Sequence, residues 1–181
     1  MKSPVKIVQI DDAKSNPLRA VAHDVKKGEF KSEMLKNLIE EMQVTLAAEE
    51  DGVALAAPQI GVSKRIFVVS PKAFEEDAKW KPLVFINPVI RKVSKKVQEM
   101  QEGCLSVRWI YGTTERHIAA TVEAYDTEGN KFTFGGSGLL AHIFQHEIDH
   151  LDGVLFIDHG YNLEEYASEE DYKTRMKKEE K

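Results

Sequence analysis

The chain has 181 residues, of which 42% are hydrophobic, and a formal net charge of −5 at pH 7. This length and composition suit one compact domain with a core of its own. Acidic and basic residues are mixed along the chain, which argues against direct nucleic-acid binding, and no apolar stretch approaches the roughly 18 residues of a membrane span. A single cysteine and no apolar signal segment predict a cytoplasmic protein, and a removed organellar transit peptide would leave no trace in this sequence.

The N-terminal part of the chain is predicted to form a short strand, a turn and a helix. Residues 5–10 alternate as a strand does, and residues 16–19 contain the turn-forming pair Asn16-Pro17. In residues 32–50 the apolar side chains recur three and four positions apart, so we expect an amphipathic helix capped by Ser32 and closed by Gly52. Its buried stripe consists of Leu35, Leu38, Ile39, Met42 and Leu46.

The remaining elements give an α+β order with no internal repeat. We expect strands at residues 66–69, 83–86, 89–97, 118–125 and 131–134, with a turn at 126–130 joining the last two. A glycine-rich run at 135–138 is expected to interrupt the sheet before a buried helix at 139–151. Residues 1–161 are predicted to form one domain, and the highly charged residues 162–181 a solvated C-terminal helix or tail.

The most informative stretch is His146-Glu147-Ile148-Asp149-His150. On a helix, positions i and i+4 share a face, so both imidazoles can bind one metal ion while Glu147 reaches the open side of that ion. Cys104, the only cysteine, would by default be a small buried residue. Together with the two histidines it supplies three protein ligands, which is one fewer than a closed structural zinc site has and leaves a position for water.

A third segment, residues 52–61, is crowded with small residues and ends in Ala56-Ala57-Pro58-Gln59. Alone it is most simply a core turn. With Glu102-Gly103-Cys104-Leu105-Ser106 and Gln145-His146-Glu147-Ile148-Asp149-His150, however, it closely resembles the three motifs of the peptide deformylase family, in the same order. The resemblance runs from about residue 5 to about residue 156.

This resemblance implies a single domain in which small antiparallel or mixed sheets pack around the central motif helix. It implies a metal-dependent hydrolase that removes the formyl group from the formylmethionine of nascent peptides. Cys104, His146 and His150 would bind one divalent ion, Fe(II) in the cell and Ni, Co or Zn in a purified sample. Glu147 would be the general base, and the Gln59 amide with the Leu105 backbone N–H would stabilise the developing oxyanion. Some family members contact the ribosome, and a transient contact is an expectation here.

A methionine pocket is predicted beside the motif helix. Leu139, His142 and Ile143 lie seven, four and three residues before His146, on or next to the same helix face. Val53 and Met100 would complete the pocket, and Gly52, Ala54 and Gly103 would contact the substrate backbone. Asp149 is expected to pair with Arg116 and so to steady the motif helix.

Three positions depart from the family pattern. Ala54 stands where the family usually has glycine, and Arg108 stands where it often has proline. His142 stands where family members often have an arginine or an apolar residue. We do not expect His142 to bind the metal, because water needs the open position.

Two other classes stay open. His-Glu-x-x-His also occurs in metallopeptidases, although Phe156 stands where one such group requires a third histidine, and Glu164, Glu165, Glu169 or Glu170 could be the third ligand of another type. The second alternative is a binding module in which the metal is only structural.

Overall fold

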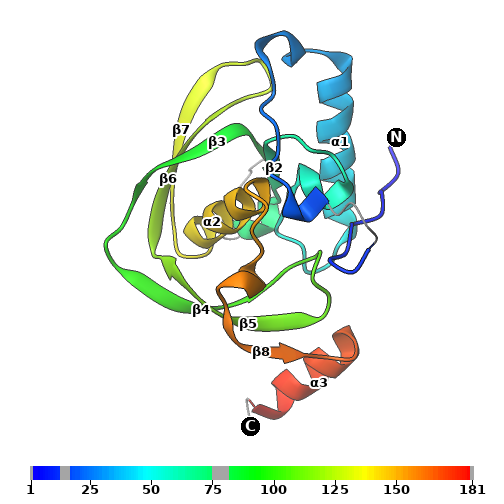
Figure 1. Ribbon diagram of the computed structural model, residues 1–181, viewed down its shortest axis with the longest axis vertical. Helices are drawn as coiled ribbons and strands as arrows, with labels where there is room; N and C mark the ends of the chain where they lie inside the picture. Colours follow the sequence, from blue (N-terminus) through cyan, green and yellow to red (C-terminus); the bar gives the residue numbers. More distant parts are fainter. Residues whose placement is uncertain (1, 13–16, 75–81, 180–181) are drawn as a thin grey trace.

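The computed structural model describes residues 2–12, 17–74 and 82–179, and two antiparallel sheets surround one helix in it (Figure 1). Helix α2 (Leu139–Leu151) contacts strands of both sheets, and helix α1 (Glu33–Ala48) packs outside β1 and β2. The expected α+β fold, with small sheets around the motif helix, is confirmed. Among the described residues, no helix combines the length and apolar character needed to cross a membrane.

The five-stranded sheet has the order β1-β2-β3-β6-β7, and the three-stranded sheet has the order β4-β5-β8. The first sheet consists of β1 (Ala54–Ala56), β2 (Ile66–Val69), β3 (Leu83–Val93), β6 (Ala119–Tyr125) and β7 (Lys131–Ser137). The second consists of β4 (Val97–Gly103), β5 (Ile110–His117) and β8 (Tyr161–Glu165).

Helix α1 begins where its sequence predicts. The Ser32 hydroxyl accepts a hydrogen bond from the Leu35 N–H at 3.1 Å, which satisfies one free donor of the first turn. The helix ends at Ala48, and Glu49 rather than Gly52 is its C-cap. Gly52 has a different role: a Cβ there would lie 2.9 Å from side-chain atoms of Leu46 and Glu49. Glycine therefore lets the next segment approach the helix end closely.

Several strand predictions were wrong in their limits. Residues 5–10 form no strand: the N–H groups of Val8 and Ile10 donate to the carbonyl of Gln59, in the 3-10 helix Ala57–Ile60, and to that of Ser106, in a turn. Residues 83–86 and 89–93 form the single strand β3, with shifts of register near Asn87, and Val97 already begins β4. Strand β7 continues through the glycine run to Ser137, because β6 pairs with it over that whole length.

Four strands, β1, β4, β5 and β8, correspond to none of the predicted ranges, and β4 shares only Val97 with the range 89–97. Strand β8 pairs with β5, so the expected boundary after residue 161 falls inside a sheet strand. Beyond it, helix α3 (Glu169–Glu179) is largely exposed.

Aromatic packing fixes helix α2 against the larger sheet. Phe67 of β2 stacks on Phe85 of β3 with ring centroids 4.6 Å apart, and Phe144 of α2 meets Phe85 edge-on at 5.3 Å. All three side chains are fully buried. Burial of one such side chain contributes roughly 1.5–3 kcal/mol, so the motif helix is held rigidly at the centre of the molecule.

Candidate active site

The structure brings Cys104, His146 and His150 together. Cys104 follows the last residue of β4, and the two histidines lie one turn apart on α2. Their ligand atoms all lie within 4.8 Å of one another, and Cys104 Sγ is 3.1 Å from His150 Nε2. One thiolate and two imidazoles at this spacing suit zinc, iron, nickel or cobalt. The donor set therefore fits the expected metal ion.

Two donors converge on the Cys104 sulfur. The Ser106 N–H is 3.4 Å from Sγ, and the Gln59 side-chain nitrogen is 3.6 Å from it. Contacts of this kind hold the sulfur in a fixed position, as the surroundings of a metal ligand do.

Glu147 is a buried carboxyl group beside these ligands. Its side chain lines the same cavity, and Oε2 has no hydrogen-bond partner among the described residues. Burial, which disfavours the charged form, raises the pKa of Glu147 to about 7. A carboxyl group that titrates near neutrality can both accept and donate a proton there.

The orientation of His146 is fixed by Glu102, a residue that the sequence analysis did not single out. Glu102 Oε1 lies 2.5 Å from His146 Nδ1, so Nε2 is the ring nitrogen left for a metal ion. Glu102 also contacts His142, Arg116 and Thr114, and its side chain is almost fully buried. Burial alone would raise the pKa of Glu102, but the hydrogen bonds from His142, His146 and Arg116 outweigh it and hold the pKa well below its usual range. Glu102 is therefore an anion at neutral pH.

His146 and His150 of α2 differ in the direction of their pKa shifts. Burial lowers the pKa of His150 well below its ordinary value and so favours the neutral, metal-binding imidazole. Burial also lowers the pKa of His146, but hydrogen bonds to Cys104 and Glu102 more than offset it and raise the pKa. A metal ion at His146 would take the place of that proton.

The predicted contact between Arg116 and Asp149 is confirmed. Arg116 Nη1 lies 2.6 Å from Asp149 Oδ2, while Nη2 lies 2.8 Å from Glu102 Oε1. Arg116 is buried, so these are not two solvated surface charges. The guanidinium group, on β5, thus joins β4, which ends at the residue before Cys104, to α2, which carries His146 and His150.

Hydrogen bonds fix the orientation of Gln59, whose amide the family resemblance implies as an oxyanion donor. Its Oε1 accepts from the Ala56 N–H at 2.8 Å, so its NH2 group points toward Cys104 and lies 3.2 Å from Ser106 Oγ. The Leu105 carbonyl, one peptide unit beyond the predicted N–H donor, accepts from the Gln9 side chain at 2.9 Å. The contacts of Gln59 preorganise its amide donor group.

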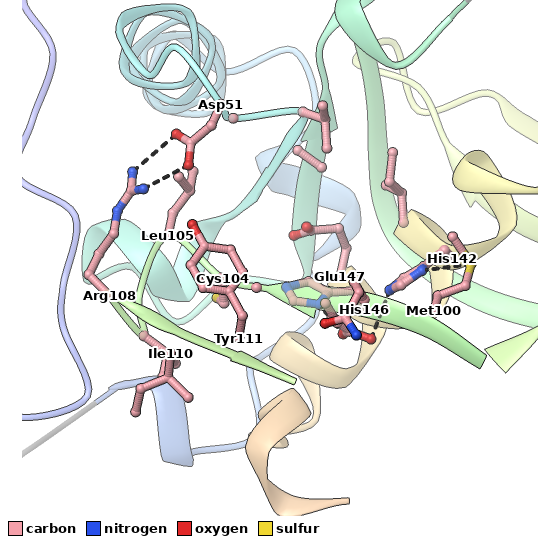
Figure 2. Close-up of a pocket in the computed structure, with 18 of the residues that line it drawn as sticks. Asp51, Met100, Cys104, Leu105, Arg108, Ile110, Tyr111, His142, His146 and Glu147 are labelled. Carbon is pink, nitrogen blue, oxygen red and sulfur yellow. Dashed lines mark hydrogen bonds and ion pairs between the residues drawn. The ribbon is translucent and has the colours of Figure 1, made fainter. Parts of the chain in front are cut away.

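A cavity of about 310 Å³ is lined by Cys104, His146 and Glu147. Figure 2 shows Met100 and His142 on one side of His146 and Glu147, and Arg108, Ile110 and Tyr111 on the other. All residues predicted to bind substrate line this cavity: Gly52, Val53, Ala54, Met100, Gly103, Leu139, His142 and Ile143.

His142 is turned to Glu102 and Met100. Its Nε2 is 2.7 Å from Glu102 Oε2, and its Nδ1 is 3.1 Å from Met100 Sδ. Glu102, His142 and His146 form a second group at metal-binding spacing, but Arg116 already neutralises Glu102 and Glu102 occupies His146 Nδ1. The Cys104 group is therefore the better metal site.

Arg108, one of the departures from the family pattern, lies at the rim of the cavity. Arg108 Nη1 is 2.8 Å from Asp51 Oδ2, and its Nη2 is 2.8 Å from Glu49 Oε2, so an ion pair joins the Cys104 loop to the segment after α1 (Figure 2). Tyr111 of β5 and Tyr172 of α3 also line the cavity. The tyrosines could not be found from sequence, because neither belongs to a recognisable motif.

Comparisons with known proteins agree on one family. A family model described as polypeptide deformylase matches residues 4–166. A peptide deformylase of Desulforudis audaxviator is 43% identical over 142 residues, which cover 78% of this chain and 85% of that protein. Peptide deformylase 1B, chloroplastic/mitochondrial, of Arabidopsis thaliana is 38% identical over 157 residues, 87% of this chain and 54% of that protein. The crystal structure of a class I type b peptide deformylase from Acinetobacter baumannii with Met-Ala-Ser bound superposes with a TM-score of 0.77 and 31% identity, covering 87% of this chain and 99% of that one.

Proposed function

The chain belongs to the polypeptide deformylase family, and we propose that it removes the formyl group from the N-terminal formylmethionine of newly made polypeptides with one metal ion held by Cys104, His146 and His150. The observation that carries the proposal is the Glu147 carboxyl group, which is buried beside these ligands with one oxygen unpaired among the described residues. A metal that was only structural would have no use for such a group. A formylated peptide, in contrast, needs a proton acceptor at this place.

The protein groups divide the reaction between them. When bound, the metal ion supplies Lewis-acid chemistry, lowering the pKa of a water molecule and polarising the formyl oxygen. Glu147 accepts a proton from the attacking water and passes it to the amine as the C–N bond breaks, so that formate and a free amino terminus leave. The Gln59 NH2 group and the Leu105 N–H donate to the formyl oxygen as negative charge develops on it. Glu102 and Arg116 keep His146 and α2 in place.

The methionine side chain would enter the apolar end of the cavity, between Met100, Leu139 and Ile143. The Acinetobacter baumannii relative was solved with Met-Ala-Ser bound, which supports a peptide that begins with methionine as the substrate. Burial of the thioether side chain should contribute roughly 1.5–3 kcal/mol, enough to favour formyl-Met over formyl-Ala by one to two orders of magnitude.

The proposal includes Fe(II) as the cellular metal, with nickel, cobalt or zinc in a purified sample, because thiolate and imidazole ligands accept all four. We also propose a cytoplasmic location, where Cys104 stays reduced. Formylated chains leave the ribosome there, and we propose a transient contact with it. The Arabidopsis thaliana relative is named as chloroplastic/mitochondrial, so an organelle is the alternative location.

The test compares three peptides with the same sequence that carry a formyl-Met, an acetyl-Met or an unblocked Met terminus. Protein loaded separately with Fe(II), Ni, Co and Zn under anaerobic conditions should release one formate per formyl peptide and leave the other two intact, with least activity for zinc. Cleavage of a peptide bond would instead identify a metallopeptidase. No reaction with any metal would favour the binding module.

A further inference from the structure

Helix α3 supplies one wall of the active-site cavity. Tyr172 lines the cavity together with Cys104 and Glu147, although it lies in the charged C-terminal segment. The residues that precede the helix hold it at the cavity. Strand β8 pairs with β5, and the Tyr166 N–H then donates to the Trp109 carbonyl at 3.0 Å. The C-terminal segment is therefore anchored to the strand that follows the Cys104 loop.

Three tyrosines hold this wall together. Tyr172 stacks on Tyr111 with ring centroids 4.0 Å apart and planes 9° apart, and Tyr166 meets Tyr172 edge-on at 5.2 Å. Tyr166 is only 5% exposed, so it is the buried anchor of the cluster. Gly103, opposite Tyr111 in the sheet, makes room for it, since a Cβ there would lie 2.6 Å from the Tyr111 ring. The position of the Tyr111 ring at the cavity thus depends on a residue of α3.

The part of the bound peptide that follows the methionine has to extend out of the cavity on the side of these tyrosines. Its formyl group lies at Cys104 and Glu147, and its methionine side chain occupies the end formed by Met100 and His142. In Figure 2 Tyr111 and Arg108 lie on the opposite side of His146 and Glu147 from that end. The residues after methionine must therefore pass Tyr111. They meet the aromatic rings of Tyr111 and Tyr172 beside Arg108, whose charge is paired with Asp51 and Glu49.

We propose that Tyr172 is a specificity-determining residue, which with Tyr111 forms an aromatic wall that favours formyl-Met peptides with aromatic side chains immediately after the methionine. This inference rests on the proposed deformylation. Aromatic pairs contribute about 0.5–1.5 kcal/mol beyond their burial, which corresponds to a preference of about two- to ten-fold.

The experiment measures kcat/KM of the metal-loaded full chain for formyl-Met-Phe-Phe-amide and formyl-Met-Gly-Gly-amide. The ratio of the two values does not depend on how much of a preparation is folded, so it stays valid for a less stable variant. We expect the wild type to prefer the Phe-Phe peptide by about three- to ten-fold, mainly through KM, and Tyr172→Ala to lower the preference to under about two-fold. Tyr172→Phe should keep it, because stacking needs only the ring.

Tyr161→Ala is the matched control. Tyr161 belongs to β8, is 40% exposed and bonds to Glu99, and it does not line the cavity. This variant should keep the wild-type ratio. Equal loss of preference in Tyr161→Ala and Tyr172→Ala, or an unchanged ratio in Tyr172→Ala, would overturn the role of Tyr172 while leaving deformylation intact. If the wild type deformylated neither peptide with any metal, the proposed function itself would fail.

Discussion

Replacing Glu102 by glutamine would remove a buried charge and keep the size of the side chain. Glu102 takes part in five polar contacts, two with Arg116 and one each with His142, His146 and Thr114. A glutamine can turn its amide nitrogen toward Thr114 and His142, because a hydroxyl group can rotate and a neutral imidazole can change tautomer to accept. Arg116 has no such freedom, since a guanidinium group can only donate.

The magnitude follows from Arg116. Removing one partner of a buried ion pair costs about 3–5 kcal/mol, and Asp149 remains as a second partner, so we expect the lower end, about 3 kcal/mol. For a protein of this size each kcal/mol lowers Tm by about 2–4 °C, which gives a fall of roughly 6–12 °C. The remaining amide oxygen can still accept from His146 Nδ1. Metal affinity should therefore fall by only about ten-fold, the low end for such supporting contacts.

The assay combines thermal unfolding of the metal-free protein with metal competition against a chromogenic chelator. Glu115→Gln is the matched control, because Glu115 is exposed on β5 next to Arg116 and the same chemical change there removes no buried charge. If Glu102→Gln melted within about 2 °C of Glu115→Gln and bound metal equally well, the buried carboxylate would not hold the site together.

Three further changes test the separate parts of the site. Cys104→Ala should keep the fold but lose most of the metal, and metal analysis showing wild-type content would exclude Cys104 as a ligand. Glu147→Gln should keep the metal and lose about 100-fold or more in kcat, because an amide cannot accept the proton; near-normal turnover would assign the base to another group. Leu139→Ala should lower the preference for formyl-Met over formyl-Ala in kcat/KM by only about three-fold, since Leu139 is 46% exposed. An unchanged preference would place the methionine elsewhere.

Elements with a strong local period were predictable from the sequence. Helix α2 begins and ends where expected, and α1 begins at its predicted cap, because apolar spacing and capping depend only on neighbouring residues. Strand β5 was missed for the opposite reason. Its buried positions include Thr113, Thr114 and Arg116, so the sequence shows no alternation of apolar and polar residues along this strand. A buried polar strand has no signature in hydrophobicity.

Glu102 shows the same limit within the site. An acidic residue after Gln101 is expected to be solvated, and its burial is tolerated only because Arg116, His142 and His146 surround it. Those partners come from β5 and α2, far along the chain. The motif around Cys104 predicted the metal ligand, but only the fold reveals the carboxylate that orients His146.

The C-terminal segment shows how a few apolar residues can outweigh a charged composition. The charges of residues 162–181 predict a solvated tail, and most of the described side chains there are indeed exposed. Tyr166 and Tyr172 nevertheless dock the segment on Tyr111. Two aromatic contacts and a strand pairing use only one face of the segment, so the charged side chains on its other face can stay in solvent. In the proposed reaction, Glu147 and the residues proposed to bind metal are constrained by the chemistry of hydrolysis, whereas the wall of Tyr111 and Tyr172 is constrained by packing. We therefore expect substitutions in α3 to change which peptides bind while the groups proposed to carry out the reaction stay the same.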